Sequence, residues 1–144
     1  MYSTDQDIFD RLGESKVRQL TDDGSTGAVD VSLVGRLRSD AAEVINTHLR
    51  GRYDLPLASP PAVLAQIEAD LLAHRLYRRR ANVDIPDSVI EAKTDAMRLL
   101  RDFASGAVPL GIDEDGDGED DGAASYRVRT SDPVLTDHMD RYFK

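Results

Sequence analysis

Residues 30–61 read DVSLVGRLRSDAAEVINTHLRGRYDLPLASPP, and this stretch decides the fold. Its first half has apolar residues at steps of three and four, which is the spacing of one face of an α-helix. The apolar residues are Val31, Val34, Leu37, Ala41, Val44, Ile45 and Leu49, and the opposite face carries Arg36, Arg38, Asp40, Glu43 and Asn46. Asp30 suits the N-cap, and Gly51 suits a left-handed position after the last turn. The stretch therefore predicts a long amphipathic helix, followed by an extended link to Pro60 and Pro61, where another helix begins.

Two short helices are predicted before this stretch. Residues 5–12 follow Thr4, which can cap the helix with Asp7 as its capping-box partner. Residues 14–20 form the second short helix, with their apolar side chains facing inward. Residues 21–30 read TDDGSTGAVD, and this composition is typical of a loop.

Two long helices are predicted after it, over residues 61–80 and 87–105. The first has a wide apolar face, which indicates burial against two neighbours. We expect Ile45, Leu71 and Leu99 to be buried together, because each lies in the middle of the apolar face of its helix. The predicted fold class is all-α: a small bundle of two short N-terminal helices and three longer ones, with an extended C-terminal arm that holds a short strand and a short helix.

The composition narrows the classes of function. The chain has 144 residues, enough for one domain, and no cysteine, which excludes disulfides and thiolate metal sites. No run of about 18 apolar residues occurs, so we expect no membrane-spanning segment, and the acidic N-terminus lacks the features of a signal peptide. The net charge is −9, but residues 113–121 hold seven acids and no base, so all other residues together carry only −2. Such a body lacks the clustered positive charge on which non-specific DNA binding depends.

The acidic segment also resembles part of a calcium site. Asp113, Asp115 and Asp117 follow the pattern of the first half of an EF-hand loop. The twelfth loop position, which needs a bidentate carboxylate, is Ala124. A solvated acidic linker is therefore the favoured interpretation, and a calcium-binding interaction module is the alternative. The three histidines lie in separate regions and no nucleophile or phosphate-loop motif occurs, so we expect neither an enzyme nor a bound cofactor.

Four arginines gather at the end of the helix predicted over residues 61–80. They are Arg75, Arg78, Arg79 and Arg80. Such a group could bind phosphate, which would make the chain a small DNA-binding regulator, or it could form an ion-pair surface with the many acids of the chain. We predict that Arg75, Arg78 and Arg79 belong to an interface.

The C-terminal residues combine alternating and aromatic side chains. The candidate interface residues there are Tyr126, Arg127, Val128, Arg129, Tyr142 and Phe143. The first four alternate as in a short strand, and the last two close a predicted short helix. This segment is interpreted as a docking tail, and a frayed terminus is the alternative. The predicted organisation is a helical domain over residues 1–112, an acidic flexible linker over 113–124 and a docking tail over 125–144.

Five stretches of the chain carry a family resemblance. They read MYSTDQDIFDRLGESKVRQLTDD, AAEVINTHLRGRYDLPL, LLAHRLYRRRA, LLRDFASGAVPLG and RVRTSDPVLTDHMDRYF. Together they resemble the head–tail connector family of Mu-like phages and prophages, with GRYDLPL and RDFASGAVPLG as the most specific parts. The resemblance covers nearly the whole chain and departs from the family at the acidic stretch, which is longer than the family needs.

This resemblance implies a virion structural protein with a helical core that acts by assembly. Connectors of this kind form a closed ring of about twelve copies beneath the portal protein. The ring extends the channel through which double-stranded DNA passes, without binding it specifically. The implied partners are therefore other copies of the chain, the portal protein and a neck or tail-completion protein. The implied location is the neck of the virion, reached after assembly in the host cytoplasm.

Overall fold

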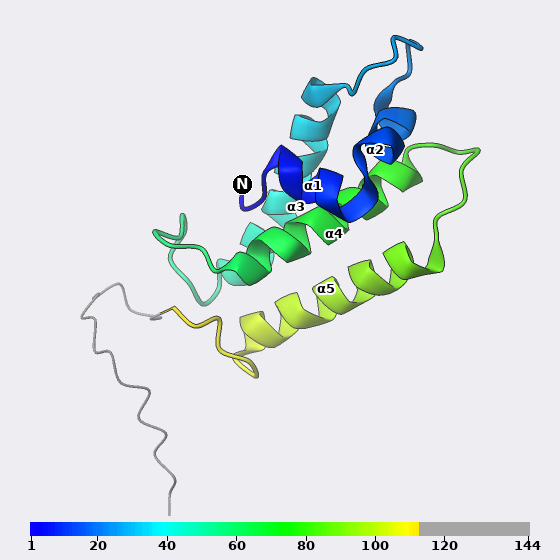
Figure 1. The fold of residues 1–144 in the computed structure, drawn as a ribbon. Coiled ribbons are helices and arrows are strands. Elements are labelled where there is room, and N and C mark those ends of the chain that lie inside the picture. The colour runs from blue at the N-terminus through cyan, green and yellow to red at the C-terminus, as the bar shows by residue number, and fades with distance from the viewer. Residues whose placement is uncertain (113–144) are drawn as a thin grey trace, which may run out of the picture.

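The computed structural model describes residues 1–112, which form a bundle of α-helices (Figure 1). The helices are α1 (Asp5–Leu12), α2 (Glu14–Thr21), α3 (Val31–Leu49), α4 (Ala62–Arg78) and α5 (Asp87–Ser105). No strand occurs in this part of the chain. The predicted all-α class, with two short helices before three longer ones, is confirmed. The predicted C-terminal strand and last helix lie outside the described residues.

Local signals set several of the helix ends as predicted. Thr4 and Asp7 form the capping box at the start of α1. The Asp30 side chain accepts a hydrogen bond from the Leu33 amide at 2.9 Å, which satisfies one of the free donors at the start of α3. Gly106 ends α5 in the left-handed conformation, with φ of 76°. Capping depends on residues within one turn of the helix end, so a local sequence pattern predicts it.

The prediction of a left-handed Gly51 is wrong. The helix α3 ends at Leu49, its C-cap residue Arg50 keeps right-handed dihedral angles, and Gly51 is absent from the described glycines with positive φ. The amides of Arg52 and Tyr53 both donate to the Leu49 carbonyl at 2.9 Å. The chain therefore continues beyond α3 in a right-handed turn. This turn brings Tyr53 into the core, where its side chain is buried.

The helix α4 lies at the centre of the bundle and contacts α1, α2, α3 and α5. The wide apolar face of α4 contributes side chains to two buried clusters, as the sequence predicts. The first cluster joins α3, α4 and α5, and includes Ile45, Leu49, Leu64, Leu71, Leu100 and Phe103. The second cluster joins α1 and α2 to the other side of α4, and includes Ile8, Val17, Leu20, Val34, Leu72 and Leu76.

Three side chains lie differently from the prediction. Val31 was placed on the buried face but is 59% exposed, because α3 turns Leu33 and Val34 inward instead. Arg38 was placed on the polar face but is only 9% exposed, and its guanidinium forms an ion pair with Asp5 of α1. Ile45 and Leu71 are buried in the first cluster as expected. Leu99 is only partly buried at its edge.

The first residues of the chain are attached to the bundle by a buried carboxylate. Glu68 of α4 is fully buried, and its Oε2 accepts hydrogen bonds from the amides of Tyr2, at 2.8 Å, and Ser3. The Tyr2 hydroxyl donates to Asn46 Oδ1 of α3 at 2.5 Å. Burial, helped by Glu68 and Glu43, raises the pKa of Tyr2, which keeps this hydroxyl protonated as a donor. Residues 1–4 thus connect α3 and α4.

Candidate interaction surfaces

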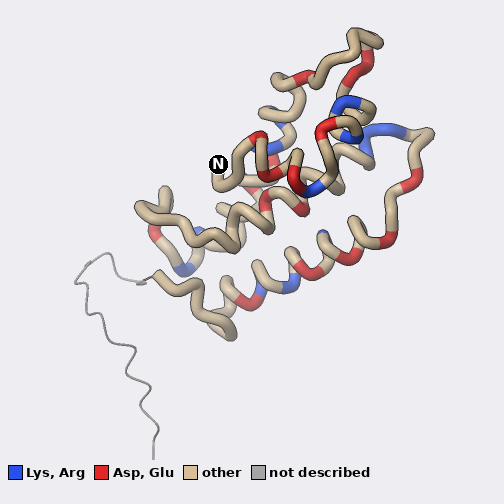
Figure 2. The backbone as a smooth tube through the Cα atoms, viewed as in Figure 1, with Lys and Arg blue, Asp and Glu red and all other residues tan. Residues whose placement is uncertain are grey.

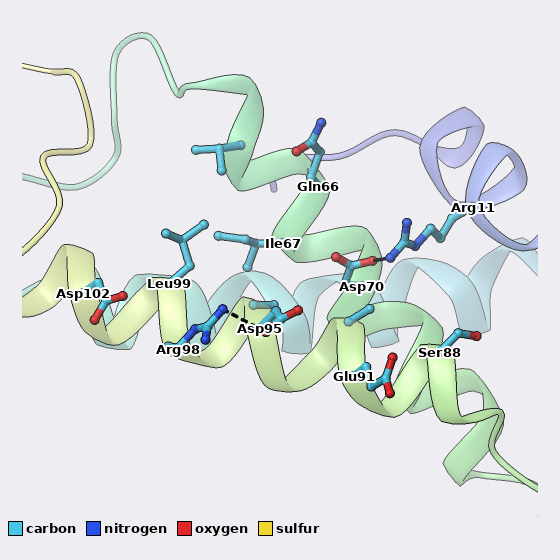
Figure 3. A pocket seen from close by; sticks show the side chains of 13 residues that line it. Arg11, Gln66, Ile67, Asp70, Ser88, Glu91, Asp95, Arg98, Leu99 and Asp102 are labelled. Carbon is cyan, nitrogen blue, oxygen red and sulfur yellow. Dashed lines mark hydrogen bonds and ion pairs between the residues drawn. The ribbon is translucent and has the colours of Figure 1, made fainter.

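An open groove runs between α4 and α5, with a volume of about 780 Å³ (Figure 3). Its apolar lining consists of Val63, Ile67, Ala92, Ala96 and Leu99. Ile67 and Leu99 point from the two helices into the space between them. The residues on α5 recur at steps of three and four, so they share one face of that helix. The alanines on this face are too short to fill the space between the two helices, and the groove stays open to solvent.

Charged side chains form the rim of this α4–α5 groove. They are Arg11, Asp70, Glu91, Asp95, Arg98 and Asp102. Four carboxylates and two guanidinium groups give the rim a formal charge of −2. An apolar floor inside a polar rim is the usual anatomy of a surface that binds another polypeptide.

The charges on the rim are paired to different degrees. Arg11 reaches from α1 to form an ion pair with Asp70 at one end of the groove (Figure 3). Burial raises the pKa of Asp70, and the nearby Arg11 opposes this shift. Asp95 is bound at 3.1 Å by Arg98, but both side chains are about 70% exposed, so the pair contributes little stability. Glu91 is exposed and forms no ion pair within residues 1–112. Glu91 and Asp95 are therefore available to an incoming cation.

The basic end of α4 is largely used inside the molecule. Arg79 binds Asp23 through two hydrogen bonds and donates to the Leu20 carbonyl at 2.6 Å. Arg80 binds Asp23 at 2.8 Å and donates to the Asp22 carbonyl at 3.2 Å. The hydrogen bonds from Arg79 lower the pKa of Asp23, and the same pairing raises the pKa of Arg79. These two arginines thus cap the C-terminus of α2 and hold the loop that follows.

The two other arginines of this group are more accessible. The Arg75 side chain is 34% exposed and lies 3.9 Å from Asp40 of α3. Arg78 is exposed, with no ion pair in the described part of the chain. Beside them, burial lowers the pKa of His74, and the positive charges of Lys93, Arg78 and Arg75 lower it further. Of the arginines predicted for an interface, Arg78 has the most exposed side chain, whereas Arg79 makes its contacts within the molecule.

The other predicted site residues lie outside the described residues. These are Asp113, Asp115, Asp117, Tyr126, Arg127, Val128, Arg129, Tyr142 and Phe143. Within residues 1–112, no group of three or more histidine or acidic side chains is arranged to hold a metal ion. In the same residues no helix is long and apolar enough to cross a bilayer.

The α4–α5 groove was missed by the sequence analysis. Ala92, Ala96 and Leu99 all fit the apolar pattern of α5, and only Ala96 among them is buried. The available signal was the row of acids beside this face, Glu91, Asp95 and Asp102, which recur at helical spacing. Small apolar residues next to a row of like charges indicate a face that is only partly covered.

The chain was compared with known proteins. Residues 2–128 match the family model described as "Bacteriophage Mu, Gp36". A similar protein is the Mu-like prophage FluMu protein gp36 of Haemophilus influenzae, which is 29% identical over 115 residues. This alignment covers 80% of the present chain and 79% of that protein. The family match includes all five described helices. The chain therefore belongs to the bacteriophage Mu Gp36 family.

Proposed function

We propose that this chain is a virion structural protein that connects the DNA-filled head of a Mu-like phage to its tail. In this proposal it forms a ring beneath the portal protein and presents a surface to a neck or tail-completion protein. Membership of the Mu Gp36 family supports the phage origin. The connector role follows from the resemblance of the GRYDLPL and RDFASGAVPLG stretches. The protein acts by assembly and not by catalysis.

The observation that carries this proposal is the α4–α5 groove. It is open along its length, has an apolar floor and is surrounded by charges of both signs. A small-molecule site is usually more enclosed and has few, convergent polar groups. The groove has instead the shape and polarity of a surface that receives a polypeptide segment, of this chain or of another, and a protein that acts by assembly can use it to hold such a segment in place.

The charge distribution agrees with a protein that surrounds passing DNA. Figure 2 shows Lys and Arg interspersed with Asp and Glu along the helices. The densest basic group lies at the end of α4, where Arg79 and Arg80 both form ion pairs with Asp23. Strong phosphate binding would need a larger excess of accessible cations. DNA could therefore slide through a channel formed by such subunits without being held.

The test is assembly in a Mu-like phage that carries this gene. Deletion of the gene should leave DNA-filled heads and separate tails that do not join, and expression of the full chain in trans should restore complete particles. Electron microscopy of the chain expressed together with the portal protein should show a ring attached to the portal. Normal yields of tailed particles from the deletion strain would contradict the proposal. So would a portal protein that remains bare in the presence of excess chain.

A further inference from the structure

The α4–α5 groove leaves apolar surface open to solvent in residues 1–112. Leu99, Ala92 and Val63 line it and are only partly buried. Exposed apolar surface with a polar rim usually marks a binding site. The groove is also negatively charged, since its rim carries a formal −2. The segment that covers it should therefore offer apolar side chains together with about two positive charges.

Such a segment occurs in the same chain. Residues 126–130 read YRVRT, in which Tyr126 and Val128 alternate with Arg127 and Arg129. Its formal charge of +2 matches the −2 of the rim. The preceding residues 113–121 carry seven acids, so the groove would repel them and they cannot be the occupant. The family match extends to residue 128 and therefore includes the start of the basic segment, beyond the described helices.

The spacing of the charges is also compatible. Glu91 and Asp95 are one turn apart on α5, so their side chains are about 6 Å apart along the helix. In an extended segment Arg127 and Arg129 are two residues apart, or about 6.6 Å. Each arginine can therefore meet one carboxylate at the same time. In this arrangement Tyr126 and Val128 face the floor of the groove.

The length of the chain allows the segment to reach its own groove. The described chain ends at Ile112, which packs against the first cluster, and two residues of the groove, Val63 and Leu99, pack against the same cluster. Figure 1 shows that the chain leaves the bundle where α5 ends and α4 begins. Residues 113–125 then connect Ile112 to Tyr126, and 13 residues can span at most about 45 Å. The part of α5 that lines the groove, from Ser88 to Asp102, is only about 21 Å long.

We propose that the α4–α5 groove binds residues 126–130 of the same chain, with Arg127 and Arg129 paired to Glu91 and Asp95. This contact would fix the start of the C-terminal segment on the bundle and present residues 131–144 from a defined position. The inference holds whether or not the protein serves as a head–tail connector. It is tested on the purified chain, so its failure is separate from a failure in virion assembly.

The experiment uses the absence of cysteine from the sequence. A single Ser125→Cys variant of the full chain carries a spin label next to the basic segment, and NMR measures the broadening of backbone amide signals. We expect strong broadening at Ala92 and Ala96 in the groove, whereas Ser32 at the start of α3 keeps a sharp signal. An isotope-labelled chain without the spin label, mixed with an unlabelled spin-labelled chain, should show no broadening, because the contact is within one molecule.

Reversing the charges of Glu91 and Asp95 tests whether these two carboxylates hold the segment in the groove. Glu91→Lys with Asp95→Lys should reduce the broadening at Ala92 to the level of Ser32. The matched control is Glu14→Lys with Asp84→Lys, which makes the same change in charge at exposed positions outside the groove and should keep the broadening. Adding Arg127→Glu and Arg129→Glu to the Glu91 and Asp95 variant restores opposite charges and should restore the broadening.

Three results would overturn the proposal. The first is no broadening at Ala92 and Ala96 in the chain with native charges. The second is broadening that also appears in the mixed sample, which would show that the segment binds a second copy. The third is broadening that survives the reversal of Glu91 and Asp95. Because both positions are exposed, circular dichroism should show the same helical content in all variants, and this separates loss of contact from loss of fold.

Discussion

Glu68 is a charged residue at a position where a helical pattern predicts an apolar one. It follows Ile67 on the buried side of α4 and is fully buried. Its partners are the amides of Tyr2 and Ser3, more than 60 residues away in the sequence. No local pattern reveals such a pair, because the contact exists only after α4 has packed against the N-terminal residues. The same reason explains why the ion pair of the buried Arg38 with the partly exposed Asp5 was missed.

Removal of the Glu68 carboxylate should release the N-terminal residues. We expect Glu68→Ala to lower the free energy of unfolding by about 1–3 kcal/mol, because two buried amides lose their acceptor. Urea unfolding followed by circular dichroism measures the change. Glu43→Ala is the matched control on α3, since the Glu43 side chain is 65% exposed and its ion pair with Arg50 is 4.0 Å long. Equal effects of the two substitutions would show that the Glu68 contacts add nothing.

His74 should make the stability of the fold depend on pH. Burial, together with Lys93, Arg78 and Arg75, lowers its pKa from the ordinary value of 6.5, so the unfolded chain binds a proton more readily than the folded one. The contribution of neutral His74 is thus complete above 6.5 and is lost as the pH falls through the lowered pKa.

The measurement is the slope of unfolding free energy against pH, between about pH 7 and 5. His74→Gln should make this slope smaller, and Lys93→Gln should reduce it in part by removing one of the charges that disfavour the protonated ring. An unchanged slope in the His74 variant would show that another group controls the pH dependence.

The helices themselves were largely predictable, because their period and caps are local. Residues 87–105 were predicted as a helix and form α5 with the same bounds. The faces of the helices were harder to predict. Leu99 and Leu100 both fit the apolar pattern of α5, but Leu100 is fully buried and Leu99 lines the groove. The choice between them depends on the angle at which α5 crosses α4, and sequence period does not determine that angle.

A comparison of two leucines tests this assignment of faces. Leu71→Ala should lower the free energy of unfolding by about 2–5 kcal/mol, because Leu71 is only 5% exposed in the first cluster and truncation leaves a cavity. Leu99→Ala should cost about half as much, since part of its side chain already contacts solvent. Urea unfolding of both variants gives the two values. A larger loss for Leu99 than for Leu71 would mean that α5 turns its other side to the core.

At the scale of the whole molecule, the sequence indicated a bundle but not the surface between its helices. The groove requires Arg11 of α1, Asp70 of α4 and Glu91 of α5 to meet, and they come from three separate elements. The ion pairs of Arg79 and Arg80 with Asp23 likewise join α4 to the loop after α2. An ion-pair surface at these arginines is one of the two predictions from the sequence, but the partner Asp23 lies 56 and 57 residues earlier and no local pattern identifies it.

We expect the C-terminal aromatic residues to matter for assembly and not for folding. We expect Tyr142→Ala with Phe143→Ala to abolish the joining of heads to tails, because aromatic side chains are among those that most often dominate an interface. Circular dichroism of the purified variant should show the helical content and cooperative unfolding of the unmodified chain, since the predicted docking tail is separate from the predicted helical domain. Thr136→Ala with Asp137→Ala is the matched control, because it changes the same segment but keeps both aromatic rings.

Particle yield is measured by complementing a phage that lacks the gene and counting complete virions by electron microscopy. Normal yield with the aromatic variant would show that attachment depends on another surface of the bundle, of which exposed Arg78 would be the first to test.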